Sequence, residues 1–230
     1  MFRHAAAVAA VALCLDTGSV HAQSPVTDPC ASGPMLYSTG QRKQAFRVFM
    51  TCAIVGDSAS QYSAAMMMRS GESNDDGSHN LFGSRVFLEQ SASQGYAEAI
   101  YALAKEFDVG SPAFQRDLNR ATELFRAAAL QGHVDAQVDL ATQYLLGRGG
   151  VPQDDSVAAH WYERAAEAGH WGAQFLIASM YEHGYGVRRD ESVALHWYER
   201  AKDGGDELAP LKAKQLRLQM ATKTRQLRLD

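Results

Sequence analysis

Apolar and small residues recur at helical spacing through most of this chain, and each such stretch ends close to a glycine. In AQVDLATQYLLG, the residues Ala136, Leu140 and Tyr144 stand at every fourth position before Gly147. This spacing places the three side chains on one face of a helix. Glycine readily adopts the left-handed conformation that ends a helix. A second apolar stretch follows after a polar loop and closes at Gly169, so the pattern predicts two short helices joined by a loop.

This two-helix unit recurs along the chain. The hexapeptide HWYERA occurs at 160–165 and again at 196–201, within a longer similarity between 136–169 and 173–205. The glycines that close successive units are Gly56, Gly95, Gly132, Gly169 and Gly205. A period of this length is typical of helical solenoids. We therefore expect a half unit at 45–56, full repeats at 57–95, 96–132, 133–169 and 170–205, and a capping helix at 206–230.

Each unit carries start and stop signals at equivalent positions. Side chains that can cap a helix N-terminus precede the second helix of every full unit: Asn80, Asp117, Asp154 and Asp190. Glycines that can end the first helix are Gly71, Gly110, Gly147 and Gly184. The shared register predicts an all-α fold, an α/α superhelical solenoid of antiparallel helix pairs.

The hexapeptide is explained by comparing its positions across the units. The positions of Trp161 and Tyr162 hold a large apolar residue in every unit, so we expect both side chains to pack inward. The position of His160 also holds arginine, valine and glutamate, which indicates a solvent-facing site. A metal or catalytic site used twice is the alternative, and the mixed chemistry of the histidine position argues against it.

The first residues are typical of a secretory signal peptide. Arg3 is followed by an unbroken apolar run at 5–15, and small residues precede Gln23, which predicts cleavage near Ala22. The run is too short to span a bilayer, and we expect no transmembrane segment in the mature chain. The sequence therefore predicts an exported protein, periplasmic or secreted, with an N-terminal linker segment at 23–44.

Export permits a disulfide. The mature chain keeps Cys30 and Cys52, and an oxidising compartment allows them to pair. We expect this bond, because it would anchor the N-terminal segment to the first helix. A buried free thiol at Cys52 is the alternative.

Other kinds of chemistry find little support. A net charge of −4 argues against nucleic-acid binding. His133 and His170 stand at equivalent repeat starts, which disfavours a metal site, and we expect no cofactor. No nucleophile elbow or phosphate-binding loop occurs, so we expect no catalytic residues. The segment from Glu207 onward is basic; a capping helix is the simpler interpretation, and contact with an anionic envelope surface is the alternative.

The repeat resembles a known family. The pattern A-x-x-x-L-A/G-x-x-Y-x-x-G-x-G-V-x-x-D, followed by A-x-x-W-Y-x-x-A-A-x-x-G, closely resembles the Sel-1-like repeat. The match is specific over 136–205 and weaker over 60–132, which lacks the G-x-G-V turn. The resemblance implies a tetratricopeptide-like, right-handed superhelix that binds proteins or peptides and is not an enzyme. Some secreted bacterial members have a cysteine pair in each repeat and a link to β-lactams; this chain lacks those pairs.

The resemblance also implies a binding surface, because the first helix of each pair lines the concave side in such superhelices. Its ligand-facing positions here form three columns: Tyr62, Tyr101, Val138 and Phe175; Met66, Lys105, Thr142 and Ser179; Arg69, Asp108, Leu145 and Glu182. We expect partner contacts at Tyr62, Arg69, Tyr101, Lys105, Phe175 and Glu182. Packing of the first column between adjacent repeats is the alternative.

Together these features predict an exported interaction scaffold or adaptor of the bacterial periplasm or envelope, which binds a partner segment on its concave face. Two alternatives stay open. One is a hydrolase acting on β-lactams or cell wall, and the other is a structural subunit of an envelope machine.

Overall fold

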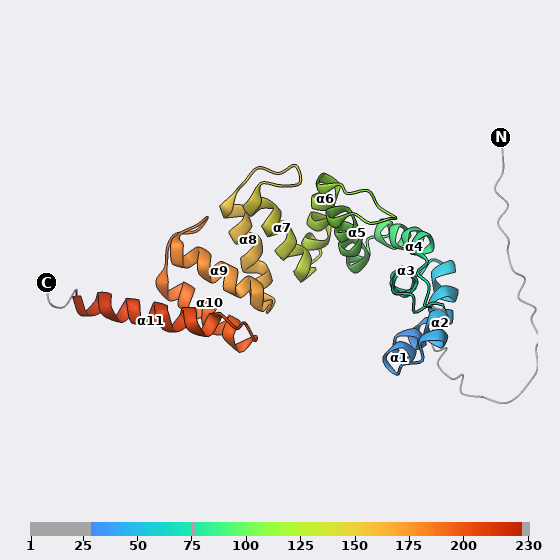
Figure 1. The fold of residues 1–230 in the computed structure, drawn as a ribbon, viewed down its shortest axis with the longest axis horizontal. Coiled ribbons are helices and arrows are strands. Elements are labelled where there is room, and N and C mark those ends of the chain that lie inside the picture. Colours follow the sequence, from blue (N-terminus) through green and yellow to red (C-terminus); the bar gives the residue numbers. More distant parts are fainter. Residues whose placement is uncertain (1–28, 75–76, 227–230) are drawn as a thin grey trace, which may run out of the picture.

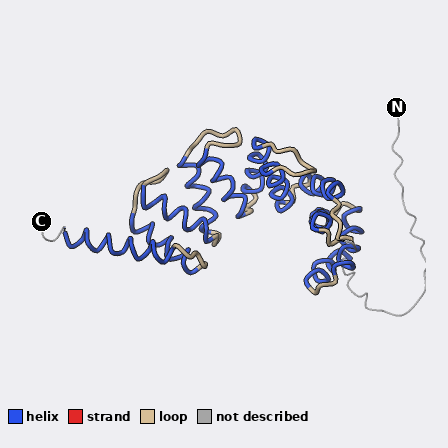
Figure 2. The backbone as a smooth tube through the Cα atoms, in the orientation of Figure 1, coloured by secondary structure: helices blue, strands red, loops and turns tan. Residues whose placement is uncertain are grey.

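Helices make up nearly all the regular structure of the computed structural model, which describes residues 29–74 and 77–226. The predicted signal peptide lies outside the described residues. The N-terminal elements are η1 (Pro29–Ala31), α1 (Ser32–Ser38), α2 (Arg42–Ile54), α3 (Ser58–Ser70) and α4 (Leu81–Ser93). The following elements are α5 (Ala97–Val109), α6 (Leu118–Leu130), α7 (Val134–Leu146), α8 (Asp155–Glu167), α9 (Trp171–His183), α10 (Glu191–Asp203) and α11 (Ala209–Gln226). Within the described ranges there is no strand, as Figure 2 shows.

Consecutive helices pair and then stack into an arch (Figure 1). The pairs are α3 with α4, α5 with α6, α7 with α8, and α9 with α10. Each second helix also packs against the first helix of the next pair, α2 packs on α3, and α11 packs on α10. Stacking of this kind buries the apolar face that a single pair would leave in water. The predicted all-α solenoid is confirmed.

The N-terminal segment differs from the expected linker. The structure places η1 and α1 within it, and α2 begins at Arg42 rather than at Ala45. Gly33 explains how α1 packs against α2, because a Cβ at this position would collide with the ring of Phe49. Pro34 lies in the first turn of α1, where its missing N–H costs little. A stretch rich in glycine and proline thus forms a helix through its contact with α2.

The predicted helix starts are confirmed by side-chain caps. Asp154 accepts hydrogen bonds from the backbone N–H groups of Ser156 and Val157 at 2.9 and 3.1 Å. The carboxylates of Asp117 and Asp190 and the amide of Asn80 cap α6, α10 and α4 in the same way. The first helices have caps of their own: His133 and His170 accept through Nδ1 from the N–H groups of Ala136 and Ala173. These two histidines are therefore structural.

The packing positions within HWYERA are also confirmed. Trp161 and Trp197 are 8% and 7% exposed, and Tyr162 and Tyr198 are buried. His160 and His196 are exposed, as are the equivalent residues Arg47, Val86 and Glu123. The repeated hexapeptide is thus a packing element with an exposed histidine.

Three buried glutamines connect neighbouring units, which the sequence analysis missed. Gln61, Gln137 and Gln174 each donate through Nε2 to a backbone carbonyl near the end of the preceding helix, those of Ala53, Ala129 and Ala166, at 3.1 to 3.2 Å. A buried amide is stable only when it is hydrogen-bonded. The signal was present in the sequence, because glutamine recurs at one position in three of the four full units.

Two glycines allow the loop of one repeat to contact the previous repeat. Gly186 has φ +67°, and a Cβ there would collide with the backbone carbonyl of Asp155, at the start of α8. Gly149 has φ +65°, and a Cβ there would collide with the Thr122 side chain and the Leu118 carbonyl at the start of α6. The two loops of the G-x-G-V type, in the third and fourth repeats, therefore require glycine for two reasons: positive φ and close approach.

The hexapeptide positions can be tested by substitution. Trp197→Ala should lower the free energy of unfolding by roughly 3–5 kcal/mol, because it empties a buried aromatic site. His196→Ala should change it by less than about 0.5 kcal/mol, because this side chain is exposed. Urea denaturation followed by circular dichroism measures both. Equal losses in the two variants would show that the histidine position is not a surface position.

The capping aspartates predict how stability changes in acid. Hydrogen bonds from the Ser156 hydroxyl and then from backbone N–H groups lower the pKa of Asp154 below 3.8, and Ser192 does the same for the pKa of Asp190. A lowered folded-state pKa adds stability that is complete above pH 3.8 and is lost as the pH falls through the folded-state pKa. The double substitution Asp154→Asn with Asp190→Asn keeps a capping side chain at both positions but removes the titrating group.

The melting temperature of the double variant should therefore fall less than that of wild type as the pH is lowered below 3.8. A control pair, Glu123→Gln with Glu167→Gln, removes two carboxylates from exposed positions on α6 and α8. Identical acid profiles for wild type and the cap variant would contradict the assignment.

Candidate functional site

The aromatic residues of the first column are half-buried, and each packs against another ring. Tyr62 lies 5.6 Å from Tyr96, measured between ring centroids, and Tyr101 stacks on His133 at 4.3 Å. Phe175 packs edge-on against Tyr198 at 5.3 Å. The structure therefore presents these aromatics as partly covered surfaces rather than as free side chains in a groove.

The charged residues predicted to contact a partner are engaged with neighbouring helices. Arg69 forms an ion pair with Glu106 on α5, and Lys105 pairs with Asp139 on α7 at 3.2 Å. Tyr101 also donates to Asp139, at 3.1 Å. Both cations thus join one repeat to the next, and their charges are already balanced.

Glu182 follows the same pattern at the C-terminal end. It accepts a hydrogen bond from the hydroxyl of Tyr198 at 2.7 Å and lies 3.8 Å from Lys212 on α11. The structure therefore brings Tyr101 and Lys105 together on Asp139, whereas the other predicted partner contacts lie in separate inter-helix clusters.

Two exposed side chains of the first helices are acidic and unpaired with lysine or arginine in the ion pairs described above. Glu98 and Asp135 stand at equivalent positions near the starts of α5 and α7, and both are exposed. Burial, reinforced by Glu98, raises the pKa of Tyr62 and of Tyr96. Burial, followed by Asp139, raises the pKa of Tyr101, with a smaller contribution from Asp135. Nearby carboxylates therefore add to the effect of burial on the pKa values of these tyrosines.

A cavity of about 330 Å³ lies where α1, α2 and α3 meet; we call it the N-terminal hollow. It is lined by Pro34, Tyr37, Phe49, Tyr62, Ser63, Met66 and Met67. Two of these residues, Tyr62 and Met66, belong to the predicted ligand-facing columns. The sequence analysis missed the hollow because one wall is formed by α1, which it assigned to a linker.

A second cavity of about 280 Å³, the C-terminal hollow, lies between the third and fourth repeats. It is lined by Leu145, Gln153, Asp155, Tyr162, Leu176, Ser179, Met180 and Tyr185. Four of its residues are the repeat equivalents of four residues in the N-terminal hollow. Phe49, Ser63, Met66 and Met67 correspond to Tyr162, Leu176, Ser179 and Met180, each at an offset of 113 residues.

The same structural position is polar at the two middle junctions. At the first, the equivalent of Met67 is Glu106, which is 5% exposed and pairs with Arg69. At the second it is Gln143, whose Nε2 lies 3.5 Å from the carboxylate of Asp108. This position of the repeat therefore holds methionine beside a hollow at the first and last junctions between units. At the two middle junctions it holds a polar residue with a polar partner.

The disulfide holds one wall of the N-terminal hollow. Cys30 and Cys52 are bonded, with Cα atoms 5.9 Å apart, as expected from the sequence. The bond joins η1 to α2 directly before α1, which supplies Pro34 and Tyr37 to the hollow. The guanidinium of Arg42 lies over the Tyr37 ring, 3.7 Å from its centre. The wall is thus fixed by a covalent bond and by ring packing.

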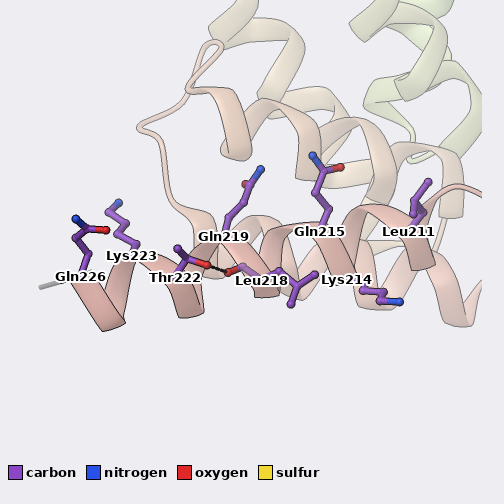
Figure 3. Close-up of a pocket in the computed structure, with 8 residues that line it drawn as sticks. All are labelled: Leu211, Lys214, Gln215, Leu218, Gln219, Thr222, Lys223 and Gln226. Atoms are coloured by element: carbon purple, nitrogen blue, oxygen red, sulfur yellow. Dashed lines mark hydrogen bonds between the residues drawn. The ribbon is translucent and has the colours of Figure 1, made fainter. Parts of the chain in front are cut away.

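The last helix exposes a shallow surface of its own. Figure 3 shows Leu211, Gln215, Leu218 and Gln219 among the side chains along one side of α11. Leu211 and Leu218 are 66% and 61% exposed, so part of the apolar surface of α11 faces solvent. The packed side consists of Ala209, Ala213 and Leu216. Because a single helix forms it, this surface is not an enclosed site.

The described residues contain no group of three or more histidine, cysteine, aspartate or glutamate side chains arranged to hold a metal ion. Among the same residues, no helix combines the length and the apolar character needed to cross a membrane. The arrangement offers surfaces and hollows for binding.

Comparisons with known proteins agree with this architecture. The Sel1 repeat family model matches residues 97–133, 134–170 and 171–206. A Sel1 repeat protein from Oxalobacter formigenes is 30% identical, with a TM-score of 0.70 over 76% of this chain and 49% of that one. A protective antigen of uropathogenic Escherichia coli with an SLR fold is 23% identical, with a TM-score of 0.53 over 87% and 51%. The chain thus spans about half the length of both structures, and no curated protein matched the sequence significantly.

The disulfide makes a prediction of its own. Cys30→Ser with Cys52→Ser should lower the free energy of unfolding by roughly 3 kcal/mol, because the bond restricts the unfolded chain. Urea denaturation measures the loss, and dithiothreitol should destabilise the wild type by a similar amount without affecting the double variant. Thiol titration of the unfolded, unreduced mature protein should find no free cysteine. Two titratable thiols would contradict the bond.

Proposed function

Because the chain belongs to the Sel1 repeat family, we propose that it is an exported interaction scaffold of the bacterial periplasm or envelope. Its partner is a protein segment that binds along the first helices, α3, α5, α7 and α9. Sel1-like repeat proteins generally mediate protein–protein interaction. The observation that carries the proposal is the pair of repeat-equivalent hollows on this surface.

Two further features support export. The disulfide is the kind of bond that persists in oxidising compartments and is rare in the cytosol. The first 22 residues have the composition of a signal peptide. Cell fractionation should find the processed protein outside the cytoplasm, starting near Gln23. Full-length protein in the cytoplasm would exclude an exported role.

The binding surface can be tested by crosslinking. A photo-reactive phenylalanine analogue at Asp135, which is exposed on α7, should give a discrete protein adduct in the native host. The same analogue at His196, exposed on the second helix α10, is the matched control and should give none. Adducts only from His196 would place the interface on the other side of the repeats and contradict the proposal.

The proposed role is not enzymatic. The mature protein should neither hydrolyse nitrocefin nor release soluble fragments from purified cell wall. Turnover that is lost when a single polar residue of the C-terminal hollow is changed, such as Asp155→Asn, would make a hydrolase the better description.

A further inference from the structure

We propose that the two hollows act together and that the arch recognises an extended partner segment with two apolar side chains and lysine or arginine between them. This inference rests on the proposed interaction role and adds the chemistry of the segment. Each apolar side chain would occupy one hollow, and the basic residues would face the acidic surface between the hollows.

The two hollows occupy equivalent places in the repeat. Both lie between a second helix and the first helix of the following repeat: α2 and α3 near the N-terminal end of the arch, and α8 and α9 one repeat before α11. Each contains an aromatic ring, Phe49 or Tyr162, and the sulfur-containing side chain of Met67 or Met180. Methionine adapts its shape to different apolar guests. The same kind of side chain therefore fits both.

The hollows are three repeats apart. The two helices of a repeat lie side by side across the stack, so each repeat advances the arch by about one helix spacing of 8–10 Å, which places the hollows on the order of 30 Å from each other. Extended chain covers this distance with roughly nine residues. The span is too long for one side chain and suits a short segment that lies along the arch.

The surface between the hollows is polar. There the position equivalent to Met67 and Met180 is taken by Glu106, which pairs with Arg69, and by Gln143, which lies beside Asp108. These polar pairs offer no place for a third apolar side chain. The arch therefore selects two apolar residues at a set separation rather than a generally apolar segment.

The charges between the hollows favour a basic partner. Lys105 and Arg69 are already neutralised by carboxylates on the next repeat, whereas Glu98 and Asp135 are exposed. The basic group that lies beside Asp135 is the imidazole of His170, whose Nε2 is 3.6 Å away. A partner with lysine or arginine at the centre of its segment complements this surface, and an acidic one is repelled.

Asp155 extends the same preference into the C-terminal hollow. Its Oδ1 is out of contact with solvent and accepts no hydrogen bond from the described residues. Burying a carboxylate oxygen without a donor is costly, so a partner N–H group at this point would improve binding. We expect a basic or amide side chain next to the apolar residue that enters this hollow.

The experiment selects peptides from a random 16-residue display library on the oxidised mature protein. Enriched peptides should share two apolar positions separated by roughly eight to twelve residues, with lysine or arginine between them. Enrichment of single apolar positions, of acidic segments, or of no peptide at all would overturn the proposal.

The hollows are then blocked one at a time, with one consensus peptide as the probe. Met66→Lys fills the N-terminal hollow and Ser179→Lys fills the C-terminal one; the fold accepts lysine here, because Lys105 holds the equivalent position in the second repeat. Each change should raise the Kd of the peptide at least about tenfold, because a second apolar residue bound by the same protein molecule multiplies the affinity of the first. His196→Lys adds the same charge on an exposed site and should change the Kd less than about twofold.

A matched peptide makes the test specific to pairing. When one apolar residue of the peptide is replaced by serine, blocking the hollow that it occupied should have no further effect, while blocking the other should still weaken binding. Circular dichroism melting confirms that each variant is folded. Additive losses, with no such coupling, would overturn the two-hollow model. If the two-hollow model failed in this way but crosslinking from Asp135 succeeded, the proposed interaction role would stand without the two-hollow model.

Discussion

Each helix pair in this protein can bury its apolar face only against the next pair, and the rest of the structure follows from that constraint. Tyr162 and Tyr198 fill the contact, and buried glutamines such as Gln174 satisfy backbone carbonyls where one unit passes to the next. The contact surface between repeats must therefore keep the same shape from unit to unit. The first and last units, which have one neighbour each, need an additional element: α1 at one end and α11 at the other.

The proposed binding function rests on variation within this constraint. A single repeat position holds Met67, Glu106, Gln143 and Met180 in successive units. The fold tolerates all four, because each has surroundings that suit it. Met67 and Met180 line apolar hollows, whereas Glu106 and Gln143 have polar partners. The stacking surface thus explains stability, and the residues beside it differ from unit to unit in a way that packing alone does not require.

The parts of this structure that the sequence predicts are those governed by local rules. Helix caps such as Asp154 and packing positions such as Tyr162 follow from residue type and register within one unit. The pairing of Arg69 with Glu106 depends on a residue 37 positions away, and the helix α1 depends on the space beside Phe49. The hollows depend on both kinds of contact, which is why the predicted columns included only some of their residues.

The covalent bond between Cys30 and Cys52 makes the two ends of the arch unequal. In a molecule whose units touch only their neighbours, unfolding starts from an end, where one set of contacts is missing. The N-terminal end is held by a bond that thermal motion does not break, whereas α11 is held by Ala209, Ala213 and Leu216 together with exposed ion pairs. Loss of structure should therefore proceed from α11 toward the N-terminus. The C-terminal hollow, only one repeat from α11, is then the more dynamic of the two, and the N-terminal hollow the more rigid.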